Sequence, residues 1–440
     1  MSYSSNSRPA PTARRTLTAS GTTSFPAPSP GTTATFLDKA LKGYSPADMP
    51  SVLPRIAAAL ESTLAFLTDP EFEALLDDPE INNFALGNPQ ELPLPELVGA
   101  LQQALEPRDK NWFAYKMNEE SSRRTIAESI GPRLGVPFAP EDVFVTNGGF
   151  GAIAATLRAV AGPGDEVIFI SPPWFFYEPL IVAVGAEPVR VRLQPPAFDL
   201  DAEAIAAAIT PRTAAVLINT PHNPTGRVYP TQQLEELARV LTEASDRHGR
   251  PVYLLSDEPY HRIVYDDLRF TTPAALYPPT FVLYSYGKTL LSPGMRMGYI
   301  AMAPGMPGAK QLRGLLFLGQ VTTGWAFANA DLQHALPRIE QLSIDVGALQ
   351  RRRDRVIPAL LEMGYQTDLP EGTFYAMVRS PLEDDQEFSR VLRRHGTLVL
   401  PGSVVELPGW FRISLTANDE MIEPGLEGFR RALSEVAARA

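Results

Sequence analysis

The sequence predicts an α/β protein: a mostly parallel sheet with helices on both faces, followed by a smaller α+β domain. Three observations lead to this fold class. Between about residues 140 and 300, short and almost wholly apolar runs alternate with helical stretches, as in parallel sheets buried on both faces. After about residue 320, long helical patterns with few strands follow. The 440 residues also exceed the usual size of one domain, which favours two domains sharing a cleft.

The N-terminal part carries helical patterns separated by loops. Apolar residues at three- and four-residue spacing predict helical structure within residues 46–80. Glycines and prolines then break residues 81–125 into loops around a short helix near 95–105. We expect residues 46–95 to form an arm that joins the smaller domain.

The expected strands of the large domain are apolar runs that end at polar or glycine-containing loops. They cover residues 143–146, 166–170, 214–218, 252–256, 281–284 and 297–301, with helices at 152–160 and 231–248. In such sheets, ligands bind in the crevice at the carboxyl ends of the strands. Because Asn147, Asn223, Asp257 and Lys288 all follow strands, we expect their side chains to lie close together.

The C-terminal part is expected to be mostly helical. Its helices are predicted at 331–361, 385–395 and 423–438, and its strands at 374–378 and 411–415. The predicted division of the chain is a disordered tail (1–45), the arm (46–95), a large domain (96–320) and a small domain (321–440).

Composition excludes several classes of function. A formal charge of −11 argues against nucleic-acid binding, which normally needs a basic face. No apolar run approaches the ~18 residues that span a bilayer. The absence of cysteine removes disulfides, thiolate metal sites and cysteine nucleophiles, and it fits a reducing cytoplasm. No metal site is predicted.

The first 37 residues contain no Asp or Glu and are rich in Ser, Thr, Pro and Ala. Their three arginines (Arg8, Arg14 and Arg15) would suit a transit peptide. Repeated prolines spoil an amphipathic helix, so we favour a disordered tail.

Lys288 is the most informative single residue. Only six lysines occur, against 33 arginines, and Lys288 is the one lysine between Lys116 and Lys310. A lysine retained in such a chain suggests a task that needs an amine nucleophile, which a guanidinium cannot supply. Ser285 and Arg296 flank it and are suitable partners for a phosphate group. A surface lysine in a Gly/Pro loop is the plain alternative.

Two further motifs favour a heterocyclic cofactor. Asp257 closes an apolar strand in the segment Ser-Asp-Glu-Pro-Tyr (256–260), where a carboxylate could keep a ring nitrogen protonated. The turn Asn-Pro-Thr-Gly (223–226) fixes the Asn223 amide as a donor. An N-cap role for Asp257 and an ordinary turn are the alternatives.

Three more candidates have weaker signals. Gly148 and Gly149 open a helix after a strand, where free backbone N–H groups favour an anion. Trp174 could stack on a planar ring or pack in the core. Arg412 falls on the face of its strand opposite Phe411 and Ile413, where it is either a solvated charge or a grip for a substrate carboxylate.

Taken together, these motifs resemble the class I/II aminotransferases, which are pyridoxal-phosphate (PLP) enzymes of fold type I. The resemblance extends from about Gly87 to the C-terminus. Its specific parts are Asn-Pro-Thr-Gly (223–226), Ser-Asp-Glu-x-Tyr (256–260), and Ser-x-x-Lys with an arginine eight residues later (285–296).

The resemblance implies the role of each candidate residue. Lys288 would hold PLP as a Schiff base and move the α-proton, with Asp257 on the pyridine nitrogen. Asn223 and Tyr260 would contact the 3-oxygen of the cofactor, and Trp174 would stack on its ring. Phosphate would be bound by Gly148, Gly149, Ser285 and Arg296, and substrate by Arg412, Asn223 and Gly87. The family's members are usually homodimers with shared active sites, and Tyr115 resembles the tyrosine that reaches the partner's phosphate.

The resemblance also has departures. The segment after Tyr115, residues 116–124, lacks the Gly turn and Leu-Arg pair typical of the family and is about two residues shorter. We predict an aminotransferase of L-α-amino acids and 2-oxo acids. The alternative is a non-transaminating PLP enzyme (a lyase, cyclase or oxidase), because residues 284–296 are also similar to aminocyclopropane-carboxylate synthases. A non-catalytic cofactor-binding protein is disfavoured because the complete catalytic set is present.

Overall fold

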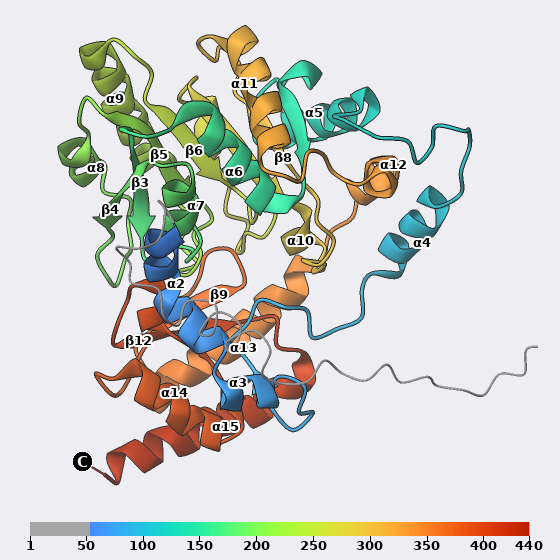
Figure 1. The fold of residues 1–440 in the computed structure, drawn as a ribbon. Helices are drawn as coiled ribbons and strands as arrows, with labels where there is room; N and C mark the ends of the chain where they lie inside the picture. Colours follow the sequence, from blue (N-terminus) through green and yellow to red (C-terminus); the bar gives the residue numbers. More distant parts are fainter. Residues whose placement is uncertain (1–52, 440) are drawn as a thin grey trace, which may run out of the picture.

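The computed structural model describes residues 53–439 and is built around one seven-stranded sheet (Figure 1). In spatial order its strands are β2 (Val143–Thr146), β8 (Gly298–Met302), β7 (Thr280–Ser285), β6 (Tyr253–Asp257), β5 (Thr213–Asn219), β3 (Glu166–Ser171) and β4 (Glu187–Arg192). The pairs from β7 to β4 are parallel, whereas β8 is antiparallel to both its neighbours. The predicted fold class is confirmed.

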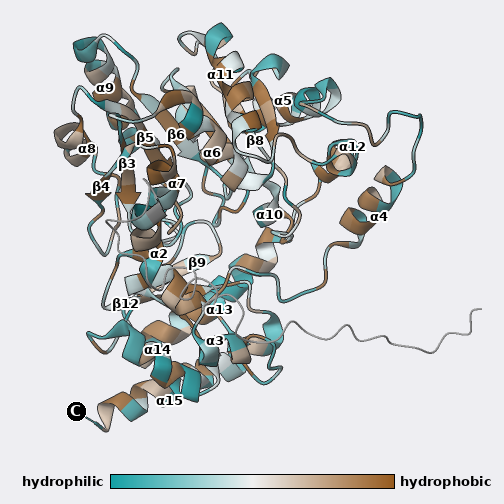
Figure 2. Ribbon diagram, in the orientation of Figure 1, coloured by the Kyte–Doolittle hydropathy of each residue, from teal (hydrophilic) through white to brown (hydrophobic). Residues whose placement is uncertain are grey.

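Both faces of this sheet are buried, which explains why its strands read as continuous apolar runs. Successive side chains of a strand point to opposite faces. In β3, Val167 and Phe169 pack with α6 (Gly148–Val160), whereas Ile168 and Ile170 pack with α9 (Thr231–His248). The first layer also contains α7 (Tyr177–Ala183) and α11 (Ala309–Thr322), and the second contains α8 (Ala202–Ala208). Figure 2 shows hydrophobic residues concentrated in this sheet.

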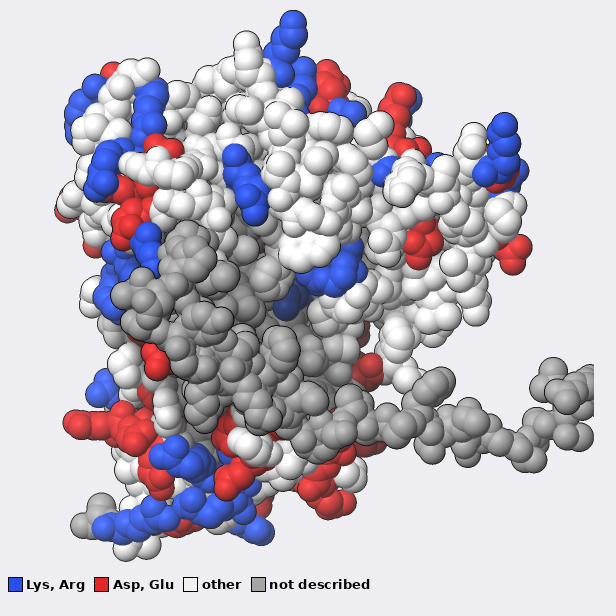
Figure 3. Space-filling model, viewed as in Figure 1, with Lys and Arg blue, Asp and Glu red and all other residues white. Residues whose placement is uncertain are grey.

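A second sheet lies in the C-terminal part. It is three-stranded and antiparallel, in the order β11 (Leu400–Pro401), β12 (Trp410–Ser414) and β9 (Tyr375–Arg379). The helices α13 (Val346–Met363), α14 (Asp385–Arg394) and α15 (Asp419–Ala437) share one hydrophobic core with it. Acidic and basic side chains are interspersed over the outer surface of α14 and α15 (Figure 3), where ion pairs such as Arg394–Glu435 join the two helices.

The N-terminal segment connects the two parts. Its helices are α2 (Leu53–Leu67) and α3 (Pro70–Leu75), followed by the short strand β1 (Asn82–Asn83), which pairs in parallel with β10 (Thr397–Leu398). Helix α2 contacts α7 on one side and the 3₁₀ turn Gly402–Val405 on the other. Helices α4 (Pro95–Ala104), α5 (Glu120–Leu134) and α12 (Ala330–Ile339) cover the edge of the large sheet formed by β2.

The structure corrects one predicted helix. The expected helix at 331–361 is two helices, α12 and α13, separated at residues 340–345. The break has a physical cause: the buried Glu340 turns inward to bind Tyr286, and Asp345 then caps α13 by accepting from the backbone N–H of Ala348 at 3.0 Å. Because α12 packs with α4 and α5, we propose that the domain boundary lies at 340–345 rather than near 320.

Other differences are additions. Helix α5 was not predicted because the face that it buries is only weakly apolar: its buried side chains are Ser122, Ile126, Ala127 and Ile130, of which only the two isoleucines are large and apolar. Strand β4, helices α7, α8 and α11 were also not predicted. The tail expected at 1–45 lies outside the described residues. Among those that are described, no helix is long and apolar enough to cross a membrane.

Candidate active site

Eight of the predicted site residues line one cavity of about 190 Å³ at the carboxyl ends of the strands of the large sheet. They are Gly149, Trp174, Asn223, Asp257, Tyr260, Ser285, Lys288 and Arg296. The parallel strands β5, β6 and β7 each end here, so residues far apart in the chain converge at this edge.

Lys288 sits on α10 (Tyr286–Thr289), a single helical turn that directly follows β7. Its ammonium nitrogen lies 6.0 Å from the ring centre of Tyr260 and 5.8 Å from that of Phe374. The turn is held from behind, because the Tyr286 hydroxyl donates to the Glu340 carboxylate and the backbone N–H of Ile344 donates to the Thr289 carbonyl. The helical turn that carries the Lys288 amine is therefore held in place by its neighbours.

Asp257 is a buried carboxylate at the end of β6. Its Oδ2 accepts a hydrogen bond of 2.5 Å from the Tyr177 hydroxyl. Burial raises the pKa of Asp257 to about 7, against the lowering effects of the Tyr177 hydrogen bond and the charge of Lys288. A cationic partner at this position would favour the ionised form. Asp257 is thus suited to pair with a protonated ring nitrogen.

The first turn of α6 forms a cradle with Ser285 and Arg296. Gly148 has a φ of +73°, and a Cβ there would lie 2.8 Å from Nη2 of Arg296. A Cβ on Gly149 would lie 3.5 Å from the Ser285 side chain. Among the residues that the structure describes, Arg296 takes part in no ion pair. Open backbone N–H groups at a helix start, a hydroxyl and an arginine without an acid partner suit a phosphate group.

Arg412, which extends from β12 toward Asn223, is a buried cation. Its Nη1 donates to Oδ1 of Asn223 at 3.1 Å, and its Nη2 donates to the carbonyl of Ala85 at 3.0 Å. The buried Nε has no partner, and within residues 53–439 no acidic side chain forms an ion pair with this guanidinium. Burial lowers the pKa of Arg412. Buried charges normally have an ionic partner, so this arginine is suited to bind an anion.

The remaining predicted residues lie around these groups. Gly87 abuts Tyr375, because a Cβ added to Gly87 would lie 1.9 Å from the Tyr375 hydroxyl oxygen. Tyr260 is buried, and burial raises the pKa of its phenol well above the ordinary value. Tyr115 does not line the cavity, and its side chain is fully exposed on the single chain.

The sequence did not reveal several residues of the site. Tyr177, which binds Asp257, had no motif to identify it. Asn219 is the last residue of β5, shortly before the predicted turn; its Nδ2 donates to the Asp257 carbonyl at 2.7 Å, and its Oδ1 accepts from the backbone N–H of Asn223 at 2.6 Å. Phe150 meets the ring of Trp174 edge-on, with ring centres 4.6 Å apart. These contacts fix the walls around the predicted residues.

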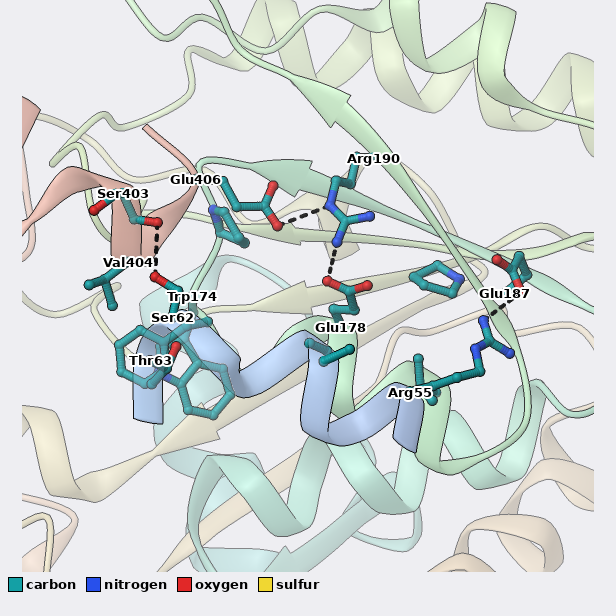
Figure 4. Close-up of a pocket in the computed structure, with 16 residues that line it drawn as sticks. Arg55, Ser62, Thr63, Trp174, Glu178, Glu187, Arg190, Ser403, Val404 and Glu406 are labelled. Atoms are coloured by element: carbon teal, nitrogen blue, oxygen red, sulfur yellow. Dashed lines mark hydrogen bonds and ion pairs between the residues drawn. The ribbon is translucent and has the colours of Figure 1, made fainter. Parts of the chain in front are cut away.

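A second and larger cavity adjoins the first at Trp174 (Figure 4). It measures about 440 Å³ and lies between α2, α7 and the 3₁₀ turn Gly402–Val405. Its charged groups are already paired: Arg55 binds Glu187 at 2.7 Å, and Arg190 binds Glu406 at 2.9 Å and also Glu178. This cavity leaves no buried charge without a partner among its lining residues.

Comparison with known proteins agrees with this geometry. The family model for aminotransferase class I and II matches residues 79–429. The chain belongs to the class I and II aminotransferases. The aspartate/prephenate aminotransferase of Thermus thermophilus is 30% identical over 77% of this chain and 88% of its own length.

Two solved aminotransferases share the fold. The aspartate aminotransferase of Thermus thermophilus with maleate has a TM-score of 0.73 and 27% identity, covering 89% of this chain and all of that chain. The N-succinyldiaminopimelate aminotransferase of Mycobacterium tuberculosis has a TM-score of 0.75 and 26% identity, covering 87% of this chain and all of that chain.

Class I and II aminotransferases use pyridoxal 5'-phosphate, so this chain is a PLP-dependent transferase of amino groups. The residues present fit the cofactor. The cradle at α6 suits its phosphate, the Asp257 carboxylate suits its ring nitrogen, and Lys288 supplies the amine.

Proposed function

We propose that this aminotransferase moves the amino group of an L-α-amino acid to a 2-oxo acid in the cavity around Lys288. The observation that carries the proposal is the buried guanidinium of Arg412, which has no acid partner among the described residues. A substrate α-carboxylate would supply the missing anion through two parallel hydrogen bonds. Asn223 links this carboxylate site to the cofactor site, because it binds Arg412 and also lines the Lys288 cavity.

The cofactor would be held by residues from several strands. Gly148, Gly149, Ser285 and Arg296 would bind its phosphate, and Asp257 its ring nitrogen. Asn223 and Tyr260 would bind the 3-oxygen, with Trp174 on the ring face. When bound, PLP supplies an electron sink that stabilises negative charge at the substrate Cα.

The protein side chains then have three tasks. Lys288 takes the proton from the substrate Cα and returns it, because its amine stands on a fixed turn beside the cavity. Asp257 places its negatively charged carboxylate next to the ring nitrogen, and the Tyr177 hydroxyl donates a hydrogen bond to that carboxylate. Arg412 holds the carboxylate and so orients the Cα–H bond.

We also propose that the protein is a homodimer with shared active sites and that it is located in the cytoplasm. Large apolar side chains are exposed both on the segment around Tyr115 and on α11: Phe113, Tyr115, Met117, Leu318 and Val321. The two segments lie together, because Nδ2 of Asn118 donates to Gln320 at 2.8 Å. Such a patch is typical of a protein interface.

A substrate panel tests the function. Purified protein with added PLP is mixed with each L-amino acid, starting with aspartate because a relative bears that name. In a single turnover we expect the visible band to disappear as the cofactor is converted to its amine form, and a 2-oxo acid to restore it. Release of ammonia or a ketone without that conversion would indicate a non-transaminating enzyme. A protein that binds no PLP would refute both readings.

A further inference from the structure

Tyr375 stacks directly on the guanidinium of Arg412. It opens strand β9, is almost fully buried, and its ring centre lies 4.0 Å from Cζ of Arg412. In the antiparallel pair of β9 and β12, Tyr375 is opposite Ser414, so Arg412 occupies the diagonal position on the same face. The close contact is thus built into the register of the sheet.

The stacking leaves the guanidinium only one orientation. Two of its five N–H groups are used, by Asn223 and by the carbonyl of Ala85. The ring of Tyr375 covers one face of the plane, so rotation of the guanidinium would lose both hydrogen bonds and the cation–π contact. The remaining N–H groups, Nε among them, lie at the edge of the plane, where a carboxylate would bind.

The hydroxyl of Tyr375 is fixed as well. It lies against Gly87, where no other residue would leave room for it. The ring meets that of Tyr260 edge-on, with centres 6.1 Å apart. Tyr375 therefore contacts three of the predicted site residues: Gly87, Tyr260 and Arg412.

We infer that Tyr375 is a positioning residue that holds Arg412 in the orientation needed for the substrate α-carboxylate. The inference rests on the proposed function, since it assigns Arg412 to that carboxylate. Its effect is confined to ligands with a carboxylate: an amine that lacks this group does not need an oriented Arg412.

The test uses the PLP-loaded enzyme and three variants. Tyr375→Leu removes the stacking ring, and Tyr375→Phe removes only the hydroxyl. Tyr365→Phe is the matched control, because Tyr365 is a buried tyrosine of the same hydrophobic core whose hydroxyl donates to the Phe429 carbonyl at 2.9 Å. The probes are the fastest L-amino acid of the panel and the amine that its decarboxylation would give.

We expect Tyr375→Leu to raise KM for the amino acid roughly tenfold, a size between those typical of exposed and of desolvated cation–π contacts, with kcat changed by less than about threefold. Binding of the amine, read from the shift of the visible band, stays unchanged. Tyr375→Phe and the control stay within about threefold of the wild type in KM, because each keeps the Arg412 stacking. In an Arg412→Ala background, Tyr375→Leu adds no further loss.

Three results would overturn the inference, two in Tyr375→Leu and one in Tyr375→Phe. The first is an unchanged KM in Tyr375→Leu, and the second is an equal loss of affinity for the amine. A tenfold loss in Tyr375→Phe would likewise show that the hydroxyl, and not the ring, is responsible. All three are read against a wild type that binds PLP and turns over the amino acid; if the wild type does neither, the proposed function itself is wrong.

Discussion

Two cavities meet at Trp174, and the smaller one is the better candidate for chemistry. The cavity beneath α2 has more than twice the volume, about 440 Å³ against about 190 Å³. Its arginine Arg190 is one-third exposed and already neutralised by Glu178 and Glu406. In the smaller cavity Asp257 is 6% exposed, and the adjoining Arg412 is 4% exposed without an acid partner among the described residues.

The comparison shows that a buried charge without a partner identifies a binding site better than the volume of a cavity does. A paired surface charge contributes little to stability and asks for no ligand. A buried charge that lacks a partner is costly, so its persistence in the fold indicates that something else binds it.

The largest expected effect is at Lys288. Lys288→Ala should abolish the visible PLP band and lower turnover by at least ~10³-fold, because it removes both the amine nucleophile and the base. Absorption spectra and single-turnover kinetics measure this. The control is Lys310→Ala on α11, which lies outside both cavities and should behave like the wild type. Similar losses in the two variants would break the comparison.

Two smaller effects are expected at Asp257, one on turnover and one on stability. Asp257→Asn should lower kcat roughly 10²-fold or more, because a neutral amide cannot hold the ring nitrogen protonated. In the cofactor-free protein the same change should be stabilising at pH 8. The native pKa of Asp257 is about 7, above the ~4 of an unfolded aspartate, so the native state binds more protons between these values.

The direction in which the stability difference changes with pH is therefore fixed. The penalty for ionising Asp257 is absent below about pH 4, grows as pH rises toward 7, and is complete above that. Melting curves of the two cofactor-free proteins at pH 5 and pH 8 measure the difference. The gain of Asp257→Asn should be larger at pH 8. Glu258, whose pKa is raised to about 8 mainly by burial, is present in both proteins. The charge of Asp257 contributes to that rise, so removing it lowers the pKa of Glu258 and adds to the gain at pH 8.

The smallest effect is expected in the larger cavity. Glu406→Gln keeps an acceptor for the Ser171 hydroxyl but removes the charge that Arg190 binds. Partly exposed ion pairs contribute only ~0–1 kcal/mol, so the melting temperature should shift by a few degrees at most. KM and kcat should stay within about threefold of the wild type. A loss comparable to that of Asp257→Asn would show that the larger cavity takes part in the reaction.

The sequence predicted the parts of the site that are local in the chain. β2 and α9 were predicted with the same bounds as in the structure, and Asn223, Asp257 and Lys288 follow strands whose apolar runs are unmistakable. Short motifs at strand ends predict the site well because the parallel sheet brings those ends to one edge.

The contacts between these parts were not predictable. Tyr177 reaches Asp257 across 80 residues, and Arg412 reaches Asn223 across 189. The break between α12 and α13 depends on Glu340 meeting Tyr286, a pairing that no helical periodicity encodes. Tyr177 and Glu340 are ordinary residues whose importance comes only from packing.

The hydrogen bond between Arg412 and Asn223 joins the C-terminal antiparallel sheet to a loop of the large parallel sheet. An anion held by both side chains would act as a cross-link between two bodies that the chain itself connects only through a few segments. Its binding energy would then also resist their separation. The more tightly such a ligand binds, the more free energy would be needed to separate the two sheets.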